Sequence, residues 1–418
     1  MQKFFSLWAA ALLFFSVCTA GGATTDGAES VSRQVSATLN DISRDLPQIT
    51  RSASRAAHRY AGGRIHIGAA GAPVFVSEMT DRSGGLRHME GWQNFDTPNW
   101  KGIVLFALRD DSLPDEAKLI TSLHTRGDLV IVFGRRETLT QAKSAGFVWD
   151  DAIETHAAAH GGLLSDGRGG WFVPTDEIGD IAAGWVWCGE FIAACTRLGR
   201  MPTVWESVYV PGGTERDAAL SAVIFDPHTP IAVPPGRIGT DYLRLLRADL
   251  GQVHAREMEN IHKAAAEAAT ARAAGHLDFL AVNGHSLWNE LAAPHFPSLF
   301  QPLQPASPNV AQPGAGDFLL ALGYTRLFDE PEYHNFAVPA RAAGAKIAWS
   351  LTDVNKDQIA AIKPGEIYID QRWGYGDAVV TMPGYDVKIL PDSGVIQQVI
   401  LLMITAQMLE LAKEAPHK

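Results

Sequence analysis

The sequence predicts an α/β protein built from two tandem doubly wound domains, each with its own parallel sheet. The chain has 418 residues, 46% of them hydrophobic, which suits two domains of ordinary size. The order strand, small-residue loop, helix occurs at Arg64–Met79 and again at Gly275–Ala293. Short apolar runs alternate with helical segments in both halves. Parallel strands covered by helices on both faces have this pattern.

In the first half, a helix is expected over Val31–Tyr60, with Pro47 as a point where it could break. Strands are expected at Arg64–Gly68, Ile103–Leu108, Asp128–Phe133 and Phe147–Ala152. Helices are expected at Val74–Arg82, Asp115–Arg126 and Ile178–Leu198. We assign residues 31–199 to an N-terminal domain and residues 200–240, rich in Pro and Gly, to an ordered inter-domain connection.

The second half, residues 241–415, repeats this order and forms the expected C-terminal domain. Its helices are expected at Tyr242–Ala274, Glu332–Ala343 and Val395–Leu411. Its strands are expected at Asp278–Val282, Asp317–Leu322, Lys346–Leu351 and Glu366–Asp370. In both halves, small or polar loop residues follow the strands, where a helix N-terminus favours an anion.

The first 23 residues have the pattern of a secretory signal peptide. Lys3 precedes the apolar run Phe4–Val17, and small residues surround the expected cleavage points after Ala20 or Ala23. Lipidation at Cys18 and retention as an anchor are the alternatives. We therefore expect an exported chain, periplasmic or secreted, without an integral membrane segment once it is mature.

The formal net charge is −11, and the sequence contains no Lys/Arg cluster, which argues against nucleic acid as a partner. No Cys/His spacing typical of a zinc site is present, so we predict neither a metal nor another cofactor.

Several short segments resemble motifs of the sugar isomerase (SIS) domain family, whose fold is flavodoxin-like. The similarity is greatest to the branch with a Gly-His-Ser loop after the first strand, found here as Gly284-His285-Ser286. The other matching segments are Arg82-Ser83-Gly84-Gly85-Leu86, Gly344-Ala345-Lys346-Ile347, Asp370 with Gly376-Asp377-Ala378, Pro174-Thr175-Asp176 and Pro391-Asp392-Ser393. The resemblance covers nearly all of the chain from about Val31.

This resemblance implies a protein that binds a sugar or sugar phosphate, or isomerises one. It places ligand-binding groups at Gly284, His285, Ser286, Gly323, Thr325 and Ser393. It also gives Glu190 and His285 as candidate catalytic acid/base residues. The first half lacks hydroxyls in its loop Gly68–Ala72 and has Asp110 and Asp111 after its second strand. We therefore expect the ligand-binding loops of the first half to be degenerate, and the ligand to lie in the second half.

Other interpretations of these residues stay open. Ser286 is suited to cap the helix expected from Leu287, which is compatible with a ligand role. Glu190 lies in an apolar helix, where a carboxylate without a partner is costly, so it needs a partner or a function. Three functional classes follow: an aldose–ketose isomerase, a non-catalytic sugar- or anion-binding protein, and a structural protein whose old site is buried in a homodimer.

Overall fold

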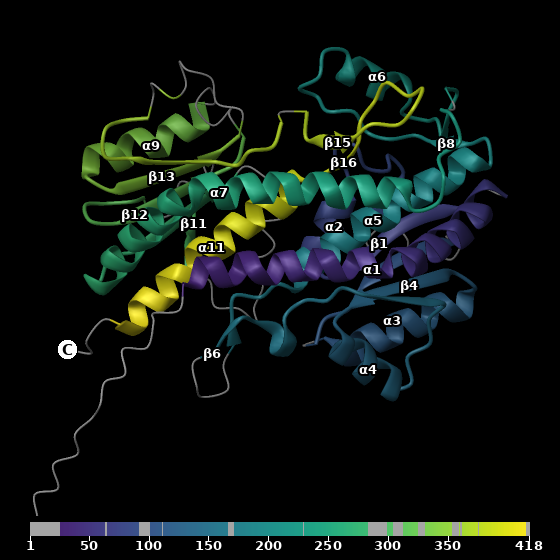
Figure 1. Ribbon diagram of the computed structural model, residues 1–418, viewed down its shortest axis with the longest axis horizontal. Helices are drawn as coiled ribbons and strands as arrows, with labels where there is room; N and C mark the ends of the chain where they lie inside the picture. The colour runs from purple at the N-terminus through teal and green to yellow at the C-terminus, as the bar shows by residue number, and fades with distance from the viewer. Residues whose placement is uncertain are drawn as a thin grey trace, which may run out of the picture.

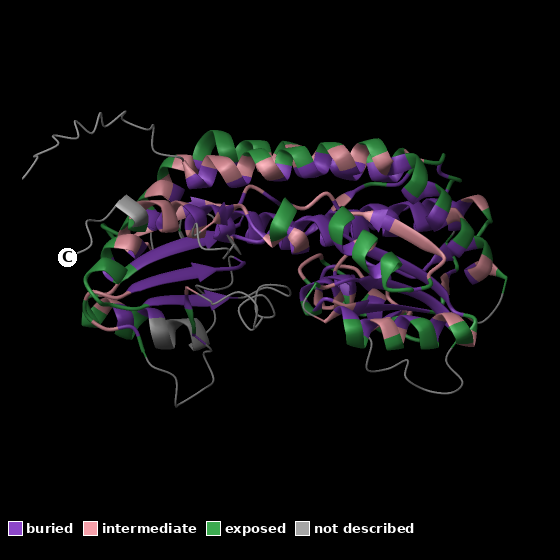
Figure 2. Ribbon diagram, turned by 90° about the horizontal axis from the view of Figure 1, so that it is seen from below, coloured by how far each residue is buried: buried purple, intermediate pink, exposed green. Residues whose placement is uncertain are grey.

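The computed structural model describes residues 26–414, apart from residues 63–64, 92–100, 111, 166–170, 229, 283–298, 304–311, 325–330, 353–358, 360–361 and 375. A layer of four long helices runs across the molecule and packs against both parallel sheets, which lie next to each other on one side of it (Figures 1 and 2). These helices are α1 (Gly27–Ala61), α5 (Asp176–Arg197), α7 (Arg237–Ala273) and α11 (Ser393–Glu414).

The first sheet has the strand order β2-β1-β3-β4-β5, and all of its pairings are parallel. Its strands are β1 (His66–Gly71), β2 (Met89–Gly91), β3 (Gly102–Ala107), β4 (Leu129–Gly134) and β5 (Asp151–Glu154). The helices of this half, besides α1 and α5, are α2 (Pro73–Met79), α3 (Leu113–Arg126) and α4 (Arg136–Ser144).

The second sheet repeats this arrangement with the order β11-β10-β12-β13-β14, again entirely parallel. Its strands are β10 (Asp278–Val282), β11 (Gln301–Pro302), β12 (Phe318–Leu322), β13 (Lys346–Leu351) and β14 (Ile367–Asp370). Helix α9 (Pro331–Ala343) contacts β13. In sequence order, both sheets read 2-1-3-4-5, which is the flavodoxin-like doubly wound topology. The predicted fold class is therefore confirmed.

Alternate residues of each central strand enter different cores, because successive side chains point to opposite faces of a sheet. In β3, Ile103 and Leu105 face the four-helix layer, whereas Val104 and Phe106 pack with α3. In the second sheet, Leu320 faces the same helix layer and Leu319 packs on the α9 side. The inner faces of the two sheets thus share one continuous hydrophobic core.

Short elements connect these layers. They are β6 (Leu164–Ser165) with β7 (Trp171–Phe172), β8 (Met201–Pro202) with β9 (Phe225–Asp226), α6 (Gly213–Ala219), and β15 (Ala378–Val380) with β16 (Ile389–Pro391). The first helix continues through Pro47 without ending there, and α7 begins at Arg237, before the expected start at Tyr242.

Two of the described helices are long and apolar enough to cross a membrane by length and composition. The relevant window of α5 is wholly buried inside the protein, and two thirds of that of α11 is buried. Both belong to the central helix layer, where an apolar surface on all sides is what a core helix needs.

Candidate functional site

The predicted site residues fall into two groups. Gly284, His285, Ser286 and Thr325 lie outside the described residues. Gly323 follows β12, at the carboxyl end of the second sheet, where doubly wound proteins bind their ligands. Its N–H donates to the Ser350 carbonyl at 3.0 Å, and its carbonyl accepts from the Gln371 side chain at 3.1 Å. The structure therefore fixes the strand-end glycine firmly to its neighbours.

Amide and hydroxyl groups surround this strand end. The Gln371 side chain also donates to the Ser350 carbonyl at 2.7 Å and accepts from the Trp373 indole N–H at 2.7 Å. The Gln397 amide of α11 donates to the Gln371 side-chain oxygen at 3.3 Å. Gln371 and Gln397 are buried, so these side chains form a rigid, uncharged hydrogen-bond network at the edge of the second sheet.

Ser393, the first residue of α11, lies in a buried ionic cluster that joins the two halves. Its hydroxyl accepts from Arg82 Nη2 at 2.6 Å. The same nitrogen donates to Asp377 Oδ2 at 3.0 Å, and Arg82 Nε lies 3.4 Å from Glu78 Oε1. Arg82 is only 1% exposed and Glu78 is fully buried. The hydroxyl expected to hold a ligand is thus engaged by a guanidinium from the first half.

Burial controls the protonation of this cluster. Loss of hydration raises the pKa of Glu78 to about 7, although the neighbouring Arg82 acts in the opposite direction. The Glu78 Oε2 atom has no hydrogen-bond partner among the described residues. A methyl group added at Gly394 would lie 2.3 Å from Glu78 Oε1, so the first turn of α11 leaves no space beside this carboxylate. Glu78 is therefore a protonatable group that is fully buried between α2 of the first half and α11 of the second.

The predicted catalytic Glu190 is fully buried in α5, and the N-terminus of α7 binds it. Glu190 Oε2 accepts from the Gly236 N–H at 2.7 Å, and Oε1 accepts from the Gly239 N–H at 2.9 Å. The Thr50 hydroxyl donates to Oε2 at 3.1 Å. The carboxylate therefore has the partners that its apolar helix requires, and it caps a helix whose first N–H groups would otherwise be unsatisfied.

The carboxyl edge of the first sheet has the opposite character. Arg135, which follows β4, is bound by Asp110 and lies 2.7 Å from Asp176 in the first turn of α5. Burial raises the pKa of Asp176 to about 6 and that of Glu177 to about 7. The pKa of Asp180 is also raised by burial, and then by these two carboxylates. Such a concentration of carboxylates at a helix N-terminus repels a phosphate.

Within the described part of the chain, no group of three or more His, Cys, Asp or Glu residues is arranged to hold a metal ion. The acidic residues of the first edge are instead paired with Arg135 or packed in the first turns of α5.

Sequence reasoning missed the buried ion pair between Glu78 and Arg82. Their spacing of four residues, with the Arg at the start of a Gly-Gly segment, was the available signal. The partners Asp377 and Ser393 are about 300 positions away, so only the folded chain reveals the cluster.

No family model matches this chain, and no curated protein matches it either. Solved structures do align with it over almost its whole length. The C-terminal domain of glucosamine-fructose-6-phosphate aminotransferase from Francisella tularensis is 10% identical, with a TM-score of 0.47, and the alignment covers 93% of this chain and 94% of that one. Tagatose-6-phosphate ketose/aldose isomerase from Escherichia coli is 11% identical, with a TM-score of 0.44, covering 93% and 90%. At this level of sequence identity, the similarity is one of overall architecture.

Proposed function

We propose that this chain binds a sugar or sugar phosphate at the carboxyl edge of its second sheet, and that it binds the ligand without isomerising it. The proposed ligand groups are Gly323 and the predicted residues Gly284, His285, Ser286 and Thr325. The first half then serves as a structural partner that fixes α11 through Arg82 and Ser393.

The observation that carries this proposal is the contrast between the two sheet edges. Three carboxylates occupy the first turns of α5 at the first edge. At the second edge, the side chains around Gly323 are neutral amides and hydroxyls, whose buried hydrogen bonds to one another and to the backbone hold the strand end in place. The nearby Asp370 and Asp377 are paired with Arg372 and Arg82. A third carboxylate, Asp392, precedes α11, and burial raises its pKa well above its ordinary value. The neutral groups around Gly323 are therefore what favours the second edge for a polyhydroxylated ligand.

Binding is favoured over catalysis by the position of Glu190. Both of its carboxylate oxygens accept from N–H groups of α7, so neither is available for proton transfer to a ligand. His285 is then the remaining candidate acid/base residue, and an isomerase that uses His285 is the alternative function.

Thermal-shift measurements with sugar phosphates, free sugars and inorganic phosphate test the proposal. A ligand that binds only the folded state raises the melting temperature by mass action. We expect a shift with at least one sugar or sugar phosphate, and we expect Ser286→Ala to abolish it. Ser112→Ala changes a serine at the edge of the first sheet and should leave the shift intact. Equal shifts in the wild type and in Ser286→Ala would place the ligand elsewhere.

An aldose–ketose conversion assay with the ligand found by thermal shift separates the two functions. We expect no turnover. Turnover that is lost in His285→Ala and retained in Glu190→Gln would replace the binding proposal by the isomerase alternative.

We also propose that the chain is exported after cleavage of a signal peptide. The expected signal peptide, residues 1–23, lies outside the described residues. Mass spectrometry of the chain expressed with its own N-terminus should find a mature protein beginning at Gly21 or Thr24, in a non-cytoplasmic fraction.

A further inference from the structure

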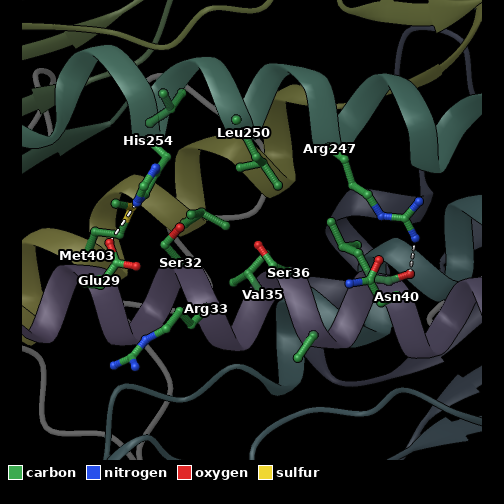
Figure 3. Close-up of a pocket in the computed structure, with 15 residues that line it drawn as sticks. Glu29, Ser32, Arg33, Val35, Ser36, Asn40, Arg247, Leu250, His254 and Met403 are labelled. Carbon is green, nitrogen blue, oxygen red and sulfur yellow. Dashed lines mark hydrogen bonds and ion pairs between the residues drawn. The ribbon is translucent and has the colours of Figure 1, made fainter.

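A groove separate from both sheet edges runs along the helix layer. Among the described residues, those that line it come from α1, α7 and α11 (Figure 3). Its volume is about 620 Å³, which lies within the range of roughly 300–1,000 Å³ typical of small-molecule sites. None of its residues takes part in the cluster around Arg82 or in the edge around Gly323.

The floor of this groove is apolar. It consists of the buried side chains Val35, Leu39, Val253, Val399 and Met403, joined by the partly buried Leu250. Ser32, Ser36 and Asn40 of α1 stand along one rim. The groove therefore offers a long apolar surface with hydroxyl and amide groups beside it.

Arg247 of α7 lies at one end of the groove (Figure 3). Its Nη2 donates to the Leu39 carbonyl at 2.6 Å, and its Nε is buried without a hydrogen-bond partner among the described residues. In that part of the chain, no carboxylate forms an ion pair with it. Loss of hydration lowers the pKa of this guanidinium, as expected for a cation without a counter-charge. A partly buried, unpaired cation is costly unless an anion accompanies it.

The other charges of the groove do not offset Arg247. Glu29, at the opposite end, is paired with His254 at 2.7 Å. Arg33 is exposed on the rim, and its Nη2 donates to the Ser30 hydroxyl at 3.2 Å. Seven residues separate Arg247 from His254, which is about 10 Å along a helix. One end of the groove is thus cationic, and an apolar surface about two helical turns long extends from it.

We propose that this groove binds a small amphiphilic carboxylate, with its anionic head at Arg247 and its alkyl chain on the apolar floor. The guanidinium fork can donate two parallel hydrogen bonds to a carboxylate, which matches the head group. The floor between Leu39 and Met403 accepts the alkyl chain.

Isothermal titration of the purified chain with decanoate, below its micelle concentration, tests this site. We expect saturable binding at one site per chain and at least tenfold weaker binding of decan-1-ol. Arg247→Met should weaken decanoate binding at least tenfold. Arg244→Met is the matched control, because Arg244 is on the same helix but largely exposed and outside this groove, and it should change nothing.

A structural role for Arg247 makes a different prediction. If its bond to the Leu39 carbonyl holds the helices together, Arg247→Met lowers the melting temperature of the ligand-free chain. We expect an unchanged or higher melting temperature, because the variant removes an uncompensated charge. Ser36 is exposed on the rim, so Ser36→Glu and Ser36→Lys should leave the folding of the chain unchanged. They should weaken and strengthen decanoate binding, respectively.

Three results would overturn the proposal. They are the absence of saturable decanoate binding, equal affinities for decanoate and decan-1-ol, and full affinity in Arg247→Met. Binding of phosphatidylglycerol vesicles without binding of decanoate would also exclude a small-molecule site and would indicate a membrane surface.

Discussion

At the scale of single residues, Glu190 is expected to contribute to stability through the N-terminus of α7. Glu190→Ala would leave the N–H groups of the partly buried Gly236 and the buried Gly239 without their acceptor. Hydrogen bonds to a charged group contribute about 1.5–3 kcal/mol, so we expect a loss of that order in the free energy of unfolding. Urea denaturation followed by circular dichroism measures it.

Glu190→Gln is the informative companion to this variant. It keeps one side-chain oxygen as an acceptor, so it should lose less stability than Glu190→Ala. Ligand-induced thermal shifts should persist in both variants. A Gln variant that is fully stable but has lost its ligand response would instead support the predicted catalytic or binding role.

Glu78 is expected to make stability depend on pH. Its pKa is about 7 in the folded chain, against an ordinary value near 4.5, so the folded state binds the proton more tightly. The contribution of Glu78 to stability is therefore fully present below about pH 4.5 and is lost as the pH rises to about 7, by up to roughly 1.4 kcal/mol per pH unit. Glu78→Gln should flatten the pH dependence of stability without abolishing it, because Glu177 has a similarly raised pKa.

The control for Glu78 is Glu259→Gln. Glu259 is exposed on α7, is paired with Lys263, and has a lowered pKa. Its substitution should leave the slope of stability between pH 5 and pH 7 unchanged. Equal slopes in the wild type and in Glu78→Gln would show that Glu78 is not the titrating group.

At the scale of elements, the Gly-Gly segment after α2 connects the first half to the second. Gly84 has φ +76°, and its carbonyl accepts from the Leu390 N–H at 3.0 Å. A methyl group there would lie 2.6 Å from Ala378 Cβ and 2.8 Å from the Leu390 nitrogen. Close contact with β15 and β16, and not only a turn, therefore requires glycine at this position.

Gly84→Ala is accordingly expected to cost more than Gly127→Ala. Gly127 also has a positive φ, +89°, but a methyl group added there would meet nothing within 4 Å. Gly127→Ala should lose only the roughly 1–2 kcal/mol of left-handed backbone strain. Gly84→Ala should lose a further 1–3 kcal/mol, approximately, through overpacking. Similar losses in chemical denaturation would argue against the inter-half contact.

At the scale of the whole molecule, the four central helices make the two halves one cooperative unit. Helix α1 contacts α5 of its own half, and it also contacts α7 and α11 of the other half. Both sheets pack their inner faces on the same core. A fragment of residues 26–199 would expose the apolar surface of α1 that α7 and α11 cover, and would leave Arg82 without Asp377 and Ser393.

We therefore expect this fragment to be insoluble or unfolded, and the full chain to unfold in a single transition. Scanning calorimetry measures this as equal calorimetric and van't Hoff enthalpies. Two separate transitions, or a folded fragment with a sharp melting curve, would show that each half has a self-sufficient core.

The central strands and the edge strand β14 were predictable from the sequence, but the edge strands β2 and β11 were not. Runs such as Ile103–Leu108 and Phe318–Leu322 are continuously apolar because helices cover both faces. Strands β2 and β11 are three and two residues long and lack such a pattern. They are strands only because β1 and β10 supply hydrogen-bonding partners.

The sequence by itself determined the doubly wound class and the repetition of its order, because both follow from local hydrophobic runs and loop composition. It also indicated that Glu190 required a partner, since burial of a carboxylate in an apolar helix is costly. Only the tertiary structure decided that this partner is the N-terminus of α7, and that Ser393 binds Arg82. These contacts join residues 49 and 311 positions apart, and such pairings depend on how the helices pack.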